Sequence, residues 1–85
     1  ENLQRFMDRQ QEIEALAMAH DGVEIAVAVR AGRELRVHLR ADAVPDDGAH
    51  LMARELAREI EKRVDYPGQV RVTVIRETRA VSFAV

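Results

Sequence analysis

Hydrophobic positions recur at two different spacings along this chain of 85 residues, and the spacing predicts its secondary structure. In residues 1–20 and 46–64 apolar side chains recur every three or four positions, which is typical of amphipathic helices. Residues 23–40 and 69–85 instead alternate apolar and polar positions, which is typical of strands. The pattern therefore predicts two helices and two pairs of strands.

Each alternating segment contains a short polar connection, so we expect each to form a hairpin. The first connection is residues 31–33 and the second is residues 76–79. After the second connection, residues 80–85 are apolar on both faces of the expected strand. We predict that this last strand lies inside the sheet, because only an interior strand hides both faces and both rows of backbone hydrogen-bonding groups.

The predicted order of elements is α-β-β-α-β-β, in one domain over residues 1–85. Short hairpins pair neighbouring strands, and the apolar last strand fits between the second and third. We therefore predict an α+β fold: a two-layer sandwich with a four-stranded antiparallel sheet in the order 1-2-4-3 and both helices on one face. No apolar run approaches the roughly 20 residues that span a membrane, so no direct membrane contact is expected.

Charge and cysteine content narrow the function classes. The net charge is −2, from 13 basic and 15 acidic residues, which excludes the strongly positive field of a dedicated nucleic-acid-binding domain. The chain has no cysteine and therefore neither a disulfide framework nor a thiolate zinc site. A reducing compartment such as the cytoplasm is its natural setting.

Arginines are expected to gather on the sheet face that the helices leave open. Guanidinium groups on an open sheet can hold phosphates. The chain has only three aromatic residues, however, and thus no obvious stacking platform for single-stranded RNA. The candidate RNA-contact residues are Arg30, Arg36, Arg40 and Arg71.

The same face is also a candidate for protein contact. Small or apolar side chains at several of its positions would make it flat enough to pack against a second copy or a neighbouring domain. The sequence leaves RNA contact, docking or homodimer formation, and structural capping open as alternatives. The candidate interface residues are Ala26, Ala28, Ile75, Ala80 and Ala84.

No residue pattern predicts catalysis by this chain. His20-Asp21 is an HD dipeptide, but His38 falls on a strand and His50 at a helix start, so further metal ligands are missing. No nucleophile-base pair and no pair of carboxylates has a spacing that requires chemistry. We predict no catalytic residue, no metal site and no cofactor in this chain.

Several strings in the chain resemble the C-terminal domain of ribonuclease Y, a bacterial endoribonuclease family that initiates messenger RNA decay. VIRETRAV is the most specific of them, and the similarity extends over nearly the whole chain. The strings are GVE at 22–24, AGRELRV at 31–37, LMARELAREIEKRV at 51–64 and DYPGQVRVTVIRETRAV at 65–81.

The resemblance implies a modular parent enzyme with a transmembrane segment, a coiled coil, a KH domain, a metal-dependent HD domain and then this piece. The chain lacks the G-x-x-G loop of a KH domain and the ligand set of an HD site, so none of the family's functional residues can be placed on it. The resemblance thus implies a non-catalytic accessory domain that docks, stabilises or dimerises the parent, with RNA contact as the alternative. Manganese or magnesium and the RNA substrate would bind the parent, whose HD domain is the expected partner. The parent would be anchored to the membrane, with this domain in the cytoplasm.

Overall fold

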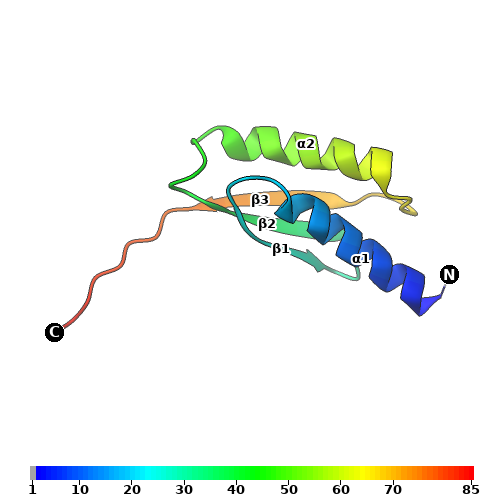
Figure 1. Cartoon of the computed structure of the whole chain (residues 1–85), viewed down its shortest axis with the longest axis horizontal. Coiled ribbons are helices and arrows are strands. Elements are labelled where there is room, and N and C mark those ends of the chain that lie inside the picture. The colour runs from blue at the N-terminus through cyan, green and yellow to red at the C-terminus, as the bar shows by residue number, and fades with distance from the viewer. Residues whose placement is uncertain (1) are drawn as a thin grey trace.

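The computed structural model describes residues 2–85 and has two layers. Figure 1 shows both helices on one face of a sheet, whose opposite face carries no helix within these residues. Helix α1 packs on β1 and helix α2 packs on β3, while the two helices also contact each other. The elements in chain order are α1 (Leu3–Met18), β1 (Val23–Val29), β2 (Glu34–Arg40), α2 (Gly48–Arg63) and β3 (Arg71–Glu77).

The sheet is mixed and has the order β1-β2-β3. Strands β1 and β2 form an antiparallel hairpin, whereas β2 and β3 are parallel. A parallel pair needs a crossover connection, and α2 supplies it by returning the chain to the end of the sheet where β2 began. The predicted four-stranded antiparallel sheet with the order 1-2-4-3 is therefore wrong.

Residues 80–85, here called the tail, form no strand in their own molecule. They continue beyond β3 and away from the sheet (Figure 1). A two-residue hairpin turn needs positive φ angles, which glycine, asparagine and aspartate favour, and residues 76–79 contain none of these. The β1–β2 turn, in contrast, has positive φ at Arg30, Ala31 and Gly32. The chain cannot reverse cheaply after β3, so β2 pairs with β3 directly.

A β-bulge in β1 decides which side chains of this strand face the helices. Val23 pairs with Leu39 while Ile25 pairs with the adjacent His38, so one extra residue is inserted at Glu24. An inserted residue reverses the alternation of all side chains on one side of it. The uniform apolar face predicted for β1 is thus split between the two faces of the sheet.

The bulge corrects the placement of two candidate interface residues. Ala26 and Ala28, which were expected on the open face, lie on the helix-covered face, and Ala26 is buried. Ile25 and Val27 instead lie on the open face, where they are 49% and 39% exposed. Small side chains at the two alanines let α1 pack closely on this edge strand, and Glu14 Oε2 accepts a 2.8 Å bond from the backbone N–H of Ala28.

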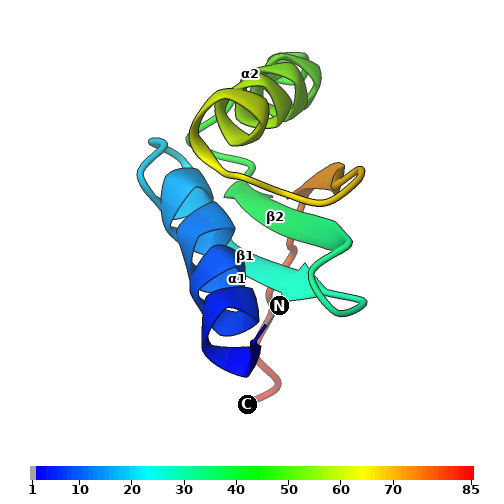
Figure 2. The same ribbon diagram turned by 90° about the vertical axis from the view of Figure 1, so that its right-hand side faces the viewer.

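The core lies between the helices and the central strand β2. Its largest fully buried side chains are Ile13, Leu35, Val37 and Leu56. On the edge strand β3, Val72 and Val74 face the helices but are only partly buried. The core is therefore complete over β2 and open at the flank of β3. Figure 2, which views the molecule from one end, shows α2 above β2 and β3.

Arg76 holds the loop between β2 and α2 in place. It was expected in a hairpin turn but belongs to β3, and its side chain reaches back across the end of the sheet. Its Nη2 donates to Ala41 O at 2.8 Å, its Nε donates to Val44 O at 2.7 Å, and its Nη1 lies 3.1 Å from Asp46 Oδ1. One side chain thus fixes a loop whose own residues form no regular structure. Among residues 2–85 no helix is long and apolar enough to cross a membrane.

A candidate arginine cluster on the open sheet face

The open face of the sheet carries three arginines around one buried carboxylate, here called the arginine cluster. The side chain of Glu34 is only 5% exposed. Its Oε1 lies 3.4 Å from Arg30 Nε, while its Oε2 lies 3.5 Å from Arg36 Nε and 4.0 Å from Arg71 Nε. Thr73 Oγ1 donates a 2.7 Å hydrogen bond to the same Oε2. The cluster therefore has three positive charges and one negative charge.

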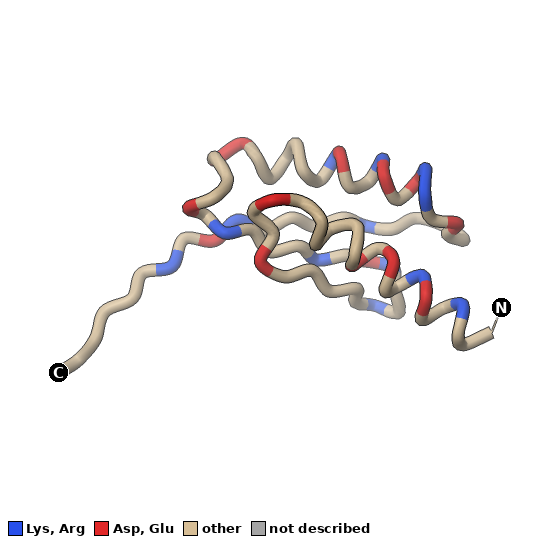
Figure 3. The backbone as a smooth tube through the Cα atoms, viewed as in Figure 1, with Lys and Arg blue, Asp and Glu red and all other residues tan. Residues whose placement is uncertain are grey.

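Each element contributes to the cluster through its register. Arg30 lies in the β1–β2 turn, and Arg36 follows Glu34 by two residues and so shares its face of β2. The parallel pairing sets Glu34 beside Arg71 and Arg36 beside Thr73. Figure 3 shows the resulting basic positions along the sheet. The antiparallel order predicted from the sequence would not have placed the start of β3 beside the start of β2.

The environment of Glu34 favours its ionised form. The hydrogen bond from Thr73 is the largest cause that lowers the pKa of the Glu34 carboxyl below its ordinary value of 4.5. Burial opposes this shift, but the charges of Arg36 and Arg30 add to the lowering and the net direction is down. The carboxylate is therefore charged at neutral pH, and it holds the three arginines in place.

The lowered pKa of Glu34 predicts a pH-dependent contribution to stability. A carboxyl whose pKa is lower in the folded state stabilises the fold above its unfolded pKa, and this contribution is lost as pH falls through the folded value. We expect Glu34→Gln to lower the melting temperature at pH 7. The difference from the parent sequence should shrink as pH falls below about 4.5. Thermal unfolding followed by circular dichroism between pH 7 and pH 3 measures it.

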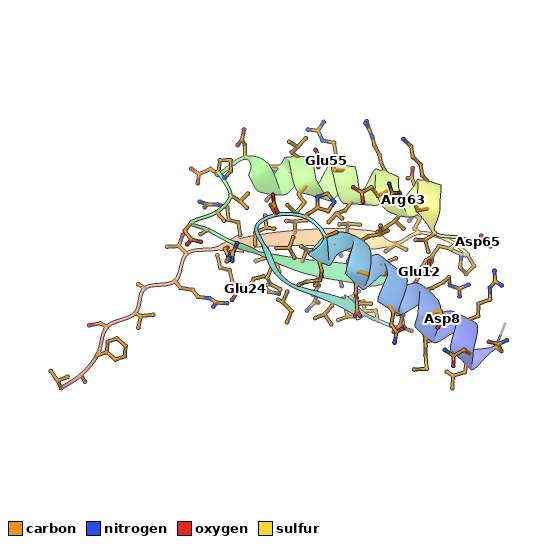
Figure 4. All side chains as sticks on the ribbon, viewed as in Figure 1. Asp8, Glu12, Glu24, Glu55, Arg63 and Asp65 are labelled. Carbon is orange, nitrogen blue, oxygen red and sulfur yellow. The ribbon has the colours of Figure 1, made fainter. Side chains whose placement is uncertain are left out.

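Glu55→Gln is the matched control for this experiment, because Glu55 is exposed on α2 (Figure 4). This variant should follow the parent sequence across the pH range. A melting-temperature difference for Glu34→Gln that stays constant down to pH 3 would contradict the assignment of Glu34 as an ionised anchor.

The fourth candidate RNA-contact residue lies apart from the cluster. Arg40 ends β2 and pairs in register with Glu77 at the opposite end of the sheet. Near it, His38 Nδ1 lies 4.0 Å from Glu77 Oε1. The structure thus brings together three of the four predicted arginines and leaves Arg40 at a separate acidic neighbour.

An apolar strip runs across the open face beside the arginine cluster. Ile25 and Val27 contribute from β1 and Ile75 from β3, with His38 and Arg36 between them on β2. Of the predicted interface residues, Ile75 lies on this face, whereas Ala80 and Ala84 lie in the exposed tail. The sequence reasoning missed Ile25 and Val27, because nothing in the alternation signals a bulge. Glu34 could have been singled out, since arginines lie four residues before it and two residues after it.

The HD dipeptide is part of a contact between the two helices. His20 Nε2 lies 2.9 Å from Glu59 Oε1, which ties the end of α1 to α2. Among residues 2–85 no three histidine, aspartate or glutamate side chains are placed to hold a metal ion.

Comparison with known proteins places the chain beside ribonuclease Y. No family model matches it, and no solved structure matches it. Over 84 residues, or 99% of its length, it is 54% identical to ribonuclease Y of Helicobacter hepaticus and 50% identical to those of Campylobacter curvus and Thermus thermophilus. The chain spans only 15–16% of the length of these relatives. The resemblance found in its sequence is confirmed: the chain is similar to one short segment of ribonuclease Y.

Proposed function

We propose, with the similarity to a segment of ribonuclease Y as the premise, that this chain is a non-catalytic accessory domain of a ribonuclease Y type endoribonuclease. We further propose that it docks on the rest of that enzyme through the open face of its sheet. The parent would hydrolyse phosphodiester bonds in RNA and start messenger RNA decay. Its manganese or magnesium ions would bind in a separate HD domain. The parent would be anchored to the membrane by another segment, with this domain in the cytoplasm.

The observation that carries the docking proposal is the composition of the open face. Ile25 and Val27 are exposed at 49% and 39%, next to the partly buried Ile75, and no helix of the described residues covers them. The arginine cluster borders this strip. Protein interfaces typically combine an apolar centre with arginine and a polar rim, and this face has that composition.

RNA contact through the arginine cluster is the second candidate. The side chains of Arg30 and Arg71 are mostly exposed and lie on either side of Glu34, so their free donors can reach a phosphate. Two observations weigh against it. The carboxylate of Glu34 already neutralises part of the charge, and the aromatic residues Phe6, Tyr66 and Phe83 lie in α1, the α2–β3 connection and the tail. RNA bases would thus find no stacking partner on the sheet.

Binding to the parent enzyme tests the docking proposal. We expect the chain to bind a parent enzyme from which the corresponding segment has been deleted, measured by isothermal titration calorimetry. Val27→Asp should weaken this binding at least about 10-fold, because it places a charge at the centre of the apolar strip and about 1.4 kcal/mol corresponds to 10-fold. Leu51→Asp is the control, since Leu51 is exposed on α2, away from the sheet. Equal binding by both variants would contradict docking through the open face.

Two measurements with RNA separate the alternatives. Single-stranded RNA incubated with the chain and manganese or magnesium should remain intact, and reproducible cleavage would overturn the non-catalytic assignment. In a salt titration, RNA binding that weakens with Arg30→Ala and Arg71→Ala but not with Val27→Asp would favour the RNA alternative over docking.

A further inference from the structure

The tail has the sequence of a strand but no strand to pair with. Val81, Phe83 and Val85 alternate with Ala80, Ser82 and Ala84, and the segment contains no charge, glycine or proline. Phe83 is 85% exposed. Figure 4 shows the side chains of this segment projecting free of the sheet, and Figure 3 shows that no charged residue follows the last arginine. An exposed apolar segment of this kind is a template for pairing with another sheet.

One edge of the sheet is free to receive such a segment. The backbone N–H of Arg71 donates to Arg33 O at 2.8 Å, toward β2. Because backbone groups alternate in direction along a strand, the N–H and C=O groups of Val72 and Val74 point to the outer edge of β3. At the opposite edge of the sheet, Glu14 already accepts a bond from the N–H of Ala28 on β1. Strand β3 is therefore the more accessible edge.

The space beside β3 suits the tail's apolar row. A hollow of about 710 Å³ lies where α2 and the start of β3 meet. The partly buried Val70 and Val72 line it from below, and Ile60 and Val64 line it from α2. A fourth strand beside β3 with Val81, Phe83 and Val85 directed toward α2 would cover the open flank of the core. The small residues on the other face of that strand would extend the open face.

The tail of the same molecule is not positioned to fill this space. Residues 76–79 lack the residues that a tight reversal requires. Arg79 Nη1 also lies 3.4 Å from Glu24 Oε1, which ties the base of the tail to β1. Strands lie about 4.8 Å apart, so β1 is about 10 Å across the sheet from β3. The tail thus leaves on the side of the sheet that is away from the free edge.

We propose that the tail of one chain pairs antiparallel with the outer edge of β3 in a second copy, and that the second copy returns its own tail in the same way. A two-fold axis relates the two copies, so each copy donates one strand and accepts one. The side chains of Val81, Phe83 and Val85 then pack against Val72 and Val74 of the other copy. This inference goes beyond the proposed accessory role, which depends on a different face and holds whether or not two chains pair.

Sedimentation velocity of the 85-residue chain over rising concentration tests the pairing. We expect a monomer–dimer equilibrium for the parent sequence and at least a 10-fold higher dissociation constant for Phe83→Asp. The fold of the variant should be unchanged, because the tail packs on nothing in its own molecule, and circular dichroism checks this. Leu51→Asp should dimerise like the parent sequence. A parent sequence that stays monomeric at all concentrations, or a dimer that Phe83→Asp leaves intact, would overturn the proposal.

Hydrogen exchange measured by NMR distinguishes strand pairing from contact through the open face. At dimer concentrations the N–H groups of Val72 and Val74 should exchange at least 10-fold more slowly than at monomer concentrations. Phe83→Asp should abolish this protection. A dimer that Val27→Asp dissociates, with no protection at Val72 and Val74, would show that the copies meet through the open face, and it would refute the tail exchange.

Discussion

Leu35→Ala is expected to lower the free energy of unfolding by about 3 kcal/mol, which is typical for removing a fully buried leucine. Leu35 is fully buried on the central strand, where its backbone pairs with Ala28 on β1 and Val72 on β3. The removed side chain leaves a cavity at a point held by neighbouring strands on both sides, so the surroundings can collapse only partly. Urea denaturation followed by circular dichroism measures the loss.

Leu51→Ala provides the matched control for this core substitution. Leu51 is exposed on α2, and removing the same four atoms there should change stability by less than about 0.5 kcal/mol. If the two variants lost equal stability, β2 would not be the centre of the core.

Arg76→Ala is expected to lower the free energy of unfolding by about 2 kcal/mol, because hydrogen bonds from a charged group to partners of limited exposure are lost. The side chain of Arg76 is mostly buried and bonds Ala41 O and Val44 O. Without it, the two carbonyl groups lose their donor and the loop before α2 loses its attachment to β3. Denaturation gives the stability, and hydrogen exchange of residues 41–47 should show faster local opening.

Arg79→Ala is the control for this substitution, since it removes the same charge three residues later. The Arg79 side chain is mostly exposed and makes one ion pair with Glu24, so its loss should cost less than about 1 kcal/mol. Arg76→Lys should recover only part of the stability, because an ammonium group cannot match the fork of donors that spans two carbonyl groups. Similar losses for Arg76→Ala and Arg79→Ala would contradict the structural role of Arg76.

The candidate site shows where sequence patterns stop being informative. Alternation correctly placed Arg36 and Arg71 on the open face, since each strand is regular around them. It misplaced Ala26 and Ala28, because a single inserted residue at Glu24 reverses every side chain that follows it in β1. The convergence of the arginines on Glu34 also depends on parallel pairing between β2 and β3, which joins residues far apart in the chain.

The amino-acid sequence by itself determined the local elements and the relatives of this protein. Helical spacing of apolar residues specifies two helices, and a turn containing Gly32 specifies the first hairpin, because these depend on interactions between residues close in the chain. The tertiary structure alone decided the pairing of β3 with β2, the facing of β1 and the position of the tail. An apolar row such as that of residues 80–85 records only that a segment tends to be buried. Whether it is buried in its own sheet depends on whether the preceding residues can turn and on which edge the rest of the fold leaves free.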